Sequence, residues 1–327
     1  MKVLITGGAG FLGAQLGRTL LQRSELLGCT LNEIVLADLV QPDADLAEDA
    51  KVRVVQGPLI EHCTALASEA FDVVFHLAGA VSAECEAAFE LGMRSNLDTT
   101  RALLDAHRVV GNCPRFIFAS SVAVFGSDSG LPLPAVIRDN TLPTPQSSYG
   151  VQKFISEQLV ADYTRKGFVD GRSGRLMTVV VRPGKPNGAA SGFLSAIVRE
   201  PLNDIQTVCP VPPEMPVALA SPGNTIAALI RLAEASREEL GGRTAINFPA
   251  LTVKVSEILD ALETVAGESA RERVLFKAEP TITRIVGGWP SVFESERAAR
   301  LGLRADADMI SIIREFMNEH GAVCVGA

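Results

Sequence analysis

Residues 1–13 of the chain read MKVLITGGAGFLG. The apolar run at 2–5 is ended by glycines and predicts a buried β-strand. Residues 11–23 then carry leucines at helical spacing, which predicts an amphipathic helix. Glycines in such a strand-to-helix turn allow a tight turn and a close approach of a pyrophosphate, while the helix N-terminus offers its N–H groups to the phosphates. We therefore expect a dinucleotide-binding loop built on Gly7, Gly10 and Gly13.

A carboxylate follows the second predicted strand, at residues 33–37. Asp38 comes 25 residues after Gly13 and ends this strand. A carboxylate at this place can accept hydrogen bonds from both ribose hydroxyls of NAD, and it would repel the 2′-phosphate of NADP. The pattern therefore predicts NAD as the cofactor.

The remaining chain alternates apolar strands with helices. Further strands are expected at 52–55, 72–76, 116–119 and 175–182, and long helices at 85–109 and 147–166. Near-continuous apolar strands alternating with helices indicate a parallel sheet that is covered on both faces. We expect an α/β fold: a Rossmann-like doubly wound parallel sheet in an NAD-binding domain (1–182), and a smaller, partly interleaved C-terminal α/β substrate domain (183–327).

The C-terminal part has a different character. Residues 183–222 are rich in proline, glycine and serine. Helical periodicity is present near 193–199 and returns at 224–235, 256–266 and 307–318.

The segment YGVQK at 149–153 places Tyr149 and Lys153 four residues apart on a predicted helix, so both side chains share one face. A free tyrosine has a pKa near ~10 and is a poor base at neutral pH. A neighbouring cation stabilises the phenolate and lowers that pKa. We expect Tyr149 to act as the base and Lys153 to assist it while also binding the nicotinamide ribose.

Two serines end the fifth predicted strand. Ligands of doubly wound sheets bind at the carboxyl ends of the strands. Ser121 is therefore expected to hold the substrate hydroxyl against Tyr149. Ser120 is either a cofactor contact or an ordinary residue at the strand end.

Composition excludes several classes of protein. The net charge of −8 argues against a nucleic-acid-binding surface. The six cysteines form no CxxC pair and the four histidines show no metal-ligand spacing, so no metal site is expected. No apolar run approaches the ~20 residues of a membrane-spanning helix. The glycines near the start would interrupt a signal peptide, so we expect a cytoplasmic protein without a membrane partner.

These motifs together resemble the extended short-chain dehydrogenase/reductase superfamily, which includes nucleotide-sugar epimerases and dehydratases. The matching segments are TGGAGFLG (6–13), Asp38, HLAG (76–79), Asn96, SSVAVFG (120–126) and YGVQK (149–153). The resemblance implies that Ser121, Tyr149 and Lys153 are catalytic. The cofactor is then expected to contact Gly7, Gly10, Gly13, Asp38, Tyr149 and Lys153. The resemblance adds further cofactor-binding residues: Phe11, Leu12, Leu59, Ala78, Gly79, Asn96, Ser120 and Pro183.

The resemblance has two further implications. Relatives pair two long helices per subunit, here 85–109 and 147–166, which implies a homodimer. Relatives often carry Gly-Asp after the third strand, where this chain has Gly57-Pro58, so an adenine contact at this point is in question.

Residues 145–153, 168–193 and 283–305 resemble more closely the D-erythronate dehydrogenase group of this superfamily. That resemblance implies NAD-dependent oxidation of the C2 hydroxyl of a four-carbon sugar acid to the 2-oxo acid. Two alternatives stay open: a nucleotide-sugar epimerase or dehydratase with tightly bound NAD, and a non-enzymatic NAD-sensing protein. A nucleotide-sugar site needs several cations for its diphosphate, and those of the second half, such as Arg199 and Arg284, are scattered.

Contacts to the sugar acid are assigned from the loops. The expected substrate-binding residues are Ser82, Ser121, Tyr149, Asn187 and Ser191. Lys185 or Arg284 could supply charge for the carboxylate. Trp289, the only tryptophan, either caps a pocket or packs in the core.

Overall fold

The computed structural model describes residues 1–184 and 190–321. The chain separates into two compact units, and each is built from three stretches of sequence. Unit 1 comprises Met1–Ser121, Ser147–Arg175 and Ile226–Ile246, and unit 2 comprises Val122–Gln146, Leu176–Thr225 and Asn247–Ala327. The division of the chain into a cofactor domain and a substrate domain at residue 182 stays a prediction.

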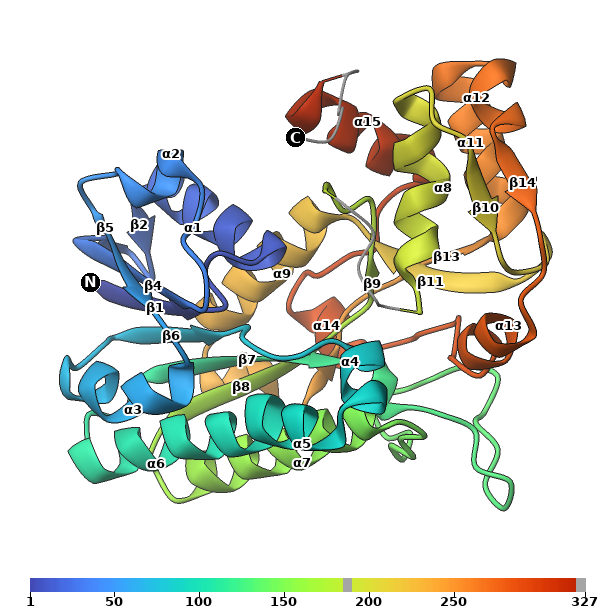
Figure 1. The fold of residues 1–327 in the computed structure, drawn as a ribbon. Helices are drawn as coiled ribbons and strands as arrows, with labels where there is room; N and C mark the ends of the chain where they lie inside the picture. Colours follow the sequence, from blue (N-terminus) through green and yellow to red (C-terminus); the bar gives the residue numbers. More distant parts are fainter. Residues whose placement is uncertain (185–189, 322–327) are drawn as a thin grey trace. The chain divides into compact units, whose positions relative to one another are not determined.

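Unit 1 is centred on a seven-stranded sheet (Figure 1). Its strands are β1 (Lys2–Thr6), β4 (Glu33–Asp38), β5 (Val52–Gln56), β6 (Val73–His76), β7 (Arg115–Ser121), β8 (Asp170–Leu176) and β12 (Ile246–Asn247). Their spatial order is β12-β8-β7-β6-β1-β4-β5, and the four pairings from β5 to β7 are parallel. From β1 the order runs outward in both directions, which is the doubly wound arrangement expected from the sequence.

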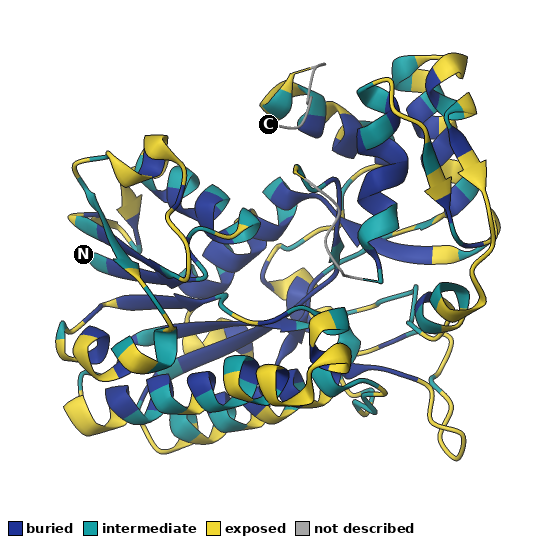
Figure 2. Ribbon diagram, viewed as in Figure 1, coloured by how far each residue is buried: buried dark blue, intermediate teal, exposed yellow. Residues whose placement is uncertain are grey.

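Helices cover the sheet of unit 1. Helices α3 (Leu59–Ser68), α6 (Thr99–Val110) and α7 (Ser148–Arg165) lie along one face, and α1 (Phe11–Arg23) lies on the other (Figure 1). Core residues of the strands, such as Val74 and Phe118, pack with Leu103 of α6 and Val160 of α7. Figure 2 shows that the central strands are mostly buried, whereas the edge strand β5 is only partly buried and the helices are exposed on their outer sides. Burial on both faces explains why these strands read as continuous apolar runs.

The helix expected at 85–109 is wrong as a single element. The chain forms α4 (Ser82–Ala87), α5 (Phe89–Gly92), a π-helix (Met93–Asp98) and α6. Ala88 interrupts the helix with a φ of −139° and a ψ of 84°. Gly92 also lies so close to α7 that a Cβ there would stand 2.6 Å from the Nε2 atom of Gln152. The wide π turn that follows carries Asn96 into the interior.

The strand expected at 175–182 is also wrong. The central sheet instead contains β8, with the polar sequence DGRSGRL, and residues 178–179 form β9 (Thr178–Val179) of another sheet. The charges of β8 are tolerated because Arg172 pairs with Asp170 and Arg175 pairs with Glu157. Apolar periodicity alone does not reveal such a strand.

Unit 2 contains two small sheets. In the first, β11 (Pro216–Ala220) pairs antiparallel with β13 (Leu251–Lys254) and parallel with β9. In the second, β10 (Thr207–Cys209) pairs parallel with β14 (Val274–Phe276). An apolar core joins them to α8 (Gly192–Leu202), α11 (Val255–Ala266) and α15 (Met309–His320), close to where helical periodicity predicts them.

The remaining elements are short or connect the units' segments. They are β2 (Glu25–Leu26), β3 (Cys29–Thr30), α2 (Ala44–Ala47), a 3-10 turn (Val122–Val124), α9 (Pro222–Glu234), α10 (Arg237–Leu240), α12 (Glu268–Glu272), α13 (Pro280–Gly287) and α14 (Glu296–Arg300). Within the described ranges, no helix has the length and apolar character needed to cross a bilayer.

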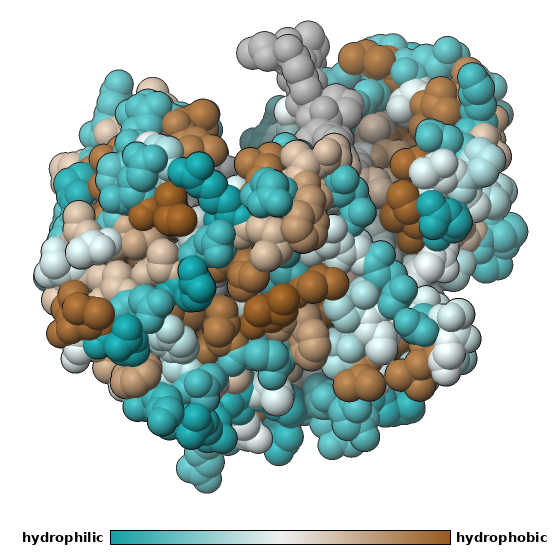
Figure 3. All heavy atoms as spheres, turned by 60° about the horizontal axis from the view of Figure 1, so that its bottom comes forward, coloured by the Kyte–Doolittle hydropathy of each residue, from teal (hydrophilic) through white to brown (hydrophobic). Residues whose placement is uncertain are grey.

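Apolar side chains are exposed on the outer side of α5 and α7. Phe89 and Leu91 of α5 are 56% and 46% exposed, and Val151 and Ile155 of α7 are 41% and 39% exposed. We call these four residues the α5–α7 patch. Figure 3 turns this side of unit 1 forward and shows brown, apolar groups between teal, hydrophilic ones.

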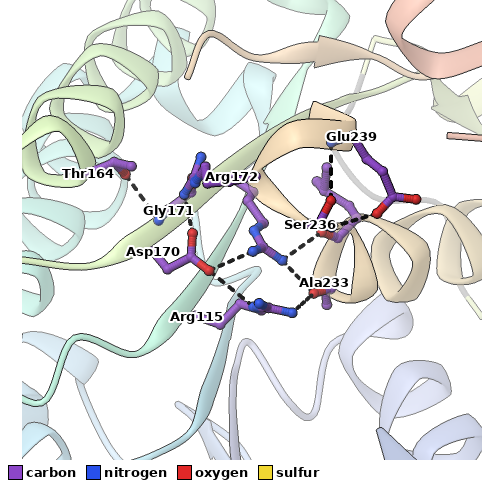
Figure 4. Close-up of polar contacts among 10 residues, drawn as sticks. Arg115, Thr164, Asp170, Gly171, Arg172, Ala233, Ser236 and Glu239 are labelled. Atoms are coloured by element: carbon purple, nitrogen blue, oxygen red, sulfur yellow. Dashed lines mark hydrogen bonds and ion pairs between the residues drawn. The ribbon is translucent and has the colours of Figure 1, made fainter. Parts of the chain in front are cut away.

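An arginine cluster holds the end of α9 against the sheet of unit 1 (Figure 4). Arg115, Arg172 and Arg237 all contact the Asp170 carboxylate. Arg115 and Arg172 also donate to the Ala233 carbonyl oxygen, over 2.8 and 2.5 Å. Cations at a helix C-terminus satisfy its last carbonyl groups and interact favourably with the helix dipole.

Candidate active site

The candidate site lies at the carboxyl ends of the central strands of unit 1. Thr6 ends β1, Asp38 ends β4, His76 ends β6 and Ser121 ends β7. Because these strands are parallel neighbours, their ends meet at one edge of the sheet. This is the edge where doubly wound folds bind their ligands.

The glycine turn after β1 admits no larger residue at its critical positions. Gly7 has a φ of +71°, and a Cβ on Gly13 would stand 2.0 Å from the Gly7 carbonyl oxygen. Gly10 is the N-cap of α1, makes no side-chain cap, and no acidic residue stands in the first turn, where Phe11 and Leu12 begin the helix. An uncapped helix N-terminus beside a close-packed glycine turn fits a bound pyrophosphate.

The Asp38 carboxylate is held at this turn. One of its oxygens accepts a 3.0 Å hydrogen bond from the Ala9 backbone N–H, and the other accepts a 2.6 Å bond from that of Leu39. A carboxylate fixed between the glycine turn and the end of β4 is placed to accept hydroxyl groups of a ribose.

Lys153 lies buried at the inner side of α7. Its side chain donates a 2.9 Å hydrogen bond to the Ala119 carbonyl oxygen, and Nζ lies 5.7 Å from the ring centre of Tyr149. Burial lowers the pKa of this lysine to about 8, although Cys85 and Glu157 oppose the shift. The two residues of the YGVQK segment therefore face the same space, as their spacing predicts.

A buried amide network lies beside Lys153. Asn96 donates to the Ala80 carbonyl oxygen at 3.2 Å and to the Gln152 Oε1 atom at 2.9 Å. These acceptors fix the orientation of the amide, so the Asn96 Oδ1 atom faces Gly79. A Cβ on Gly79 would stand 2.6 Å from this oxygen and 3.5 Å from the Lys153 Nζ atom.

The Asn96 Oδ1 atom is buried and has no hydrogen-bond partner among the described residues. A buried acceptor without a donor is costly unless a ligand or water supplies one. With the glycine turn and Asp38, this orphaned acceptor fits a dinucleotide whose ribose hydroxyls reach Lys153 and Asn96.

His76 forms a second buried network, which we did not predict. Its ring nitrogens lie 2.7 Å from the Thr6 hydroxyl and 2.9 Å from the Thr100 hydroxyl. The Thr100 hydroxyl donates its proton to the Asn96 carbonyl oxygen, so it can only accept a hydrogen bond from the His76 Nε2–H group. The other ring nitrogen of His76, Nδ1, then accepts a hydrogen bond from the Thr6 hydroxyl. Burial lowers the pKa of His76 to about 3, so the ring stays neutral and links the glycine turn to the π-helix.

The other residues assigned to the cofactor lie at several places. Ala78 donates a long 3.4 Å bond from its backbone to Thr6, and Leu59 begins α3 and packs partly against the core. The Ser120 hydroxyl donates to Glu157 over 2.5 Å. Pro183 lies in unit 2, in an irregular segment that follows β9.

Residues assigned to the substrate belong to both units. Ser82 begins α4 in unit 1, whereas Ser191 is the N-cap of α8 in unit 2. Asn187 and Lys185 lie outside the described residues.

Three residues of unit 2 singled out in the sequence have clear surroundings. Arg284, on α13, is exposed. Arg199 is buried and donates to the Arg182 carbonyl oxygen and to Glu200, so its charge is already engaged. Trp289 packs against the core of unit 2 and lines a small apolar pocket with Val217 and Val286.

Sequence reasoning missed the buried pair of Glu157 on α7 and Arg175 on β8. Glu157 follows Lys153 by one helical turn. An acidic residue four positions after Lys153, on the inner face of the helix, is the signal that could have revealed it. Across residues 1–184 and 190–321, no group of three or more metal-binding side chains is present.

Comparisons with known proteins agree with this geometry. Residues 3–212 match the NAD dependent epimerase/dehydratase family. The chain is 48% identical to a D-erythronate dehydrogenase of Cupriavidus necator, over 98% of this chain and 99% of that protein. It is 40% identical to a D-erythronate dehydrogenase of Haemophilus influenzae, over 97% and 99% of the two chains.

A solved structure is similar over the whole length. The crystal structure described as a nucleoside-diphosphate-sugar epimerase from Agrobacterium tumefaciens superposes with a TM-score of 0.93 at 39% identity, and covers 99% of this chain and 96% of that chain. A nicotinamide dinucleotide is therefore the class of cofactor that the family of this chain uses.

Proposed function

Because the chain belongs to the NAD dependent epimerase/dehydratase family, we propose that it is an NAD-dependent dehydrogenase that oxidises the C2 hydroxyl of a four-carbon sugar acid such as D-erythronate to the 2-oxo acid. The observation that carries the proposal is the 48% identity to a D-erythronate dehydrogenase over nearly the full length of both chains. The buried Lys153 beside Tyr149 supports it, because a dehydrogenase needs a base with an assisting cation.

NAD is proposed in preference to NADP. The Asp38 carboxylate is fixed beside the glycine turn by the Ala9 N–H. A second negative charge on the ribose would be repelled there, whereas two free hydroxyls would donate to the carboxylate.

The residues of unit 1 supply acid–base chemistry and orientation. Ser121 and Tyr149 hold the C2 hydroxyl, and the Tyr149 phenolate takes its proton as the C2–H bond breaks and the C2=O bond forms. Lys153 stabilises the phenolate, because its own ammonium is held in place by the Ala119 carbonyl. When bound, NAD would accept the hydride that leaves C2.

A direct assay tests the proposal. Purified protein is mixed with NAD and each stereoisomer of the four-carbon 2,3,4-trihydroxy acids, and NADH is followed by its absorbance. We expect steady NADH formation with D-erythronate, less with NADP, and none with the Tyr149→Phe variant. Full turnover by Tyr149→Phe would refute the role of the phenol.

The alternative is a nucleotide-sugar epimerase, which the description of the Agrobacterium tumefaciens structure favours. Such an enzyme returns the hydride to its substrate, so it retains its cofactor and releases no NADH. Interconversion of UDP-glucose and UDP-galactose without added NAD would support this alternative, and steady NADH release with D-erythronate would exclude it.

We also propose that the enzyme is a homodimer, with the α5–α7 patch as the surface that a second copy covers. The patch exposes four large apolar side chains on adjacent helices. Exposed apolar patches mark interaction sites, and in a two-fold dimer the same patch of both subunits meets at the interface.

A further inference from the structure

A buried ion pair lies one helical turn beyond Lys153 on α7. Glu157 of α7 is 2% exposed and Arg175 of β8 is 5% exposed. The Arg175 guanidinium binds both carboxylate oxygens, with Nε at 2.9 Å from Oε1 and Nη2 at 2.7 Å from Oε2. Oε1 also accepts a 2.5 Å hydrogen bond from the Ser120 hydroxyl. One carboxylate thus joins α7, β7 and β8.

Stability alone is a poor reason for such a pair. Removing two charges from water costs about as much as their attraction returns, and apolar residues of similar volume often replace a buried ion pair without loss. A bidentate pair is directional and apolar packing is not, because the two hydrogen bonds require one relative orientation of the two side chains.

The orientation that this pair fixes affects the candidate active site. Glu157 follows Lys153 by one helical turn on the inner face of α7, and Lys153 follows Tyr149 by one turn. Lys153 binds the Ala119 carbonyl and Glu157 binds the Ser120 hydroxyl. Two consecutive residues at the end of β7 are therefore attached to two consecutive turns of α7, immediately before Ser121.

We propose that Glu157 and Arg175 are positioning residues, which lock the end of β7 to α7 and thereby set Ser121 against Tyr149. This inference rests on the proposed function, since it assigns these two residues a share in the same reaction. Ser120 is the link between the pair and the strand. Its hydroxyl donates to Glu157, and Ser121 is the next residue and the last of β7.

The same carboxylate acts on Lys153 through its charge. Glu157 and Cys85 counteract the burial that lowers the pKa of Lys153. The other ionisable groups nearby are the Tyr149 phenol of the same helix, the neutral His76 of β6 and the Arg175 guanidinium, which compensates Glu157. Removing the carboxylate should lower the pKa of Lys153 further, so that the alkaline limb of the pH profile moves to lower pH.

Three variants test the proposal, after the wild-type enzyme has been shown to turn over D-erythronate. Glu157→Gln keeps the size and removes the charge. The double variant Glu157→Leu/Arg175→Met replaces the pair by apolar side chains. Ser120→Ala removes the link to β7 and leaves the ion pair intact. Asp162→Asn is the control, because Asp162 forms an exposed pair with Arg165 on the same helix.

For each variant, kcat, KM for both substrates, the pH profile, the NAD dissociation constant and the thermal midpoint are measured. We expect kcat of Glu157→Gln to fall by ~10²-fold, the loss that a displacement of about 1 Å can cause, with NAD affinity within twofold of wild type. The apolar double variant should have a thermal midpoint close to that of wild type but keep a low kcat. Ser120→Ala should lose about tenfold in kcat without a loss of stability.

Two results would overturn the proposal: wild-type kcat in the apolar double variant, or a Glu157→Gln enzyme that loses only thermal stability. If the double variant does not fold, Ser120→Ala decides, and unchanged kcat there counts against the proposal. A wild-type protein without activity on any four-carbon acid would instead refute the proposed function. The NAD dissociation constant is still measurable in that case.

Discussion

The Lys153 ammonium donates a 2.9 Å hydrogen bond to the Ala119 carbonyl oxygen, which places a buried cation between α7 and the end of β7. Burial lowers the pKa of Lys153 from 10.5 to about 8. Between these two values the unfolded chain binds more protons than the folded chain, so this group makes stability rise with pH over that window. Below pH 8 the buried charge costs stability.

Lys153→Met should therefore separate stability from function. The free energy of unfolding of the variant, relative to wild type, should decline by about 2–3 kcal/mol between pH 7 and pH 10, as wild type is relieved of its buried charge. Urea unfolding at both pH values without NAD measures this difference. Turnover of Lys153→Met should be lost at every pH, and a relative stability that does not change with pH would contradict the prediction.

Asp38 should control the choice of dinucleotide. Asp38→Ala removes the carboxylate beside the Ala9 N–H. We expect KM for NAD to rise by at least about tenfold, the loss of roughly 1.4 kcal/mol of binding, and KM for NADP to fall, because the repulsion of its phosphate is gone. Asp43→Ala, at an exposed acid that pairs with Arg18, is the control and should leave both KM values unchanged. An unchanged preference for NAD in Asp38→Ala would exclude the assigned role.

The core of the fold follows from the sequence because its determinants are local. The glycine turn, the apolar strands and the spacing of Tyr149 and Lys153 each lie within one short stretch. The helix from Phe11 to Arg23 has the bounds that its leucine spacing predicts. The interruption at Ala88 has no such local signal, and the turn after it packs at Gly92 closely against Gln152, far along the chain.

The charged residues of β8 and their partners show the same limit. Asp170, Arg172, Arg175 and Glu157 look like surface residues in the sequence, yet most of β8 is buried, because Arg172 pairs with Asp170 of the same strand and Arg175 pairs with Glu157 of α7. The partners are 2 to 18 residues apart and no period connects them. Pairing of this kind is a property of the folded chain, which explains why the predicted strand at 175–182 is displaced from the observed one.

Gly13 and Gly17 lie one turn apart on α1 and should respond in opposite ways to alanine. A Cβ at Gly13 would overlap the Gly7 carbonyl oxygen at 2.0 Å, whereas at Gly17 it would meet Leu46 and Leu36 at ordinary distances of 3.5 to 4.0 Å. Gly13→Ala should prevent NAD binding and lower the thermal midpoint strongly. Gly17→Ala should keep activity and gain about 0.5–1 kcal/mol from helix propensity. Equal behaviour of the two variants would contradict the close packing of the turn.

Asp170 should carry a large share of the stability of unit 1. It is the common partner of Arg115 and Arg172, which Figure 4 shows, and of Arg237. Asp170→Asn would leave the buried Arg172 without a counter-ion, and burial already lowers the pKa of Arg172 to about 10. We expect a loss of about 3–5 kcal/mol in the free energy of unfolding, as for other broken buried pairs.

Asp162→Asn provides the comparison, since an exposed pair contributes at most about 1 kcal/mol. Urea unfolding measures both variants. In a folded sample at low temperature, Asp170→Asn should retain its kcat, because Asp170 lies among the arginines and α9 rather than at the carboxyl ends of the strands. A stability close to that of Asp162→Asn would show that the arginine cluster needs no acid.

The α5–α7 patch should determine the oligomeric state. Val151 and Ile155 stand one turn apart on the outer side of α7, and α5, which carries the exposed Phe89, packs against this helix. Glutamates at both positions would bury two unpaired charges in an interface, which costs several kcal/mol and should give monomers in light scattering. Ile205→Glu changes an equally apolar residue of unit 2, 50% exposed, and should leave the dimer intact.

The Val151→Glu/Ile155→Glu double variant should also lose thermal stability and turnover. The outer side of α7 is the reverse of the face that carries Tyr149 and Lys153, so a partner subunit covering it would restrain the catalytic helix from behind. Turnover should then depend on protein concentration near the dissociation constant of the dimer, in wild type as well. A wild-type protein that is monomeric and fully active at micromolar concentration would refute both the interface and this restraint on α7.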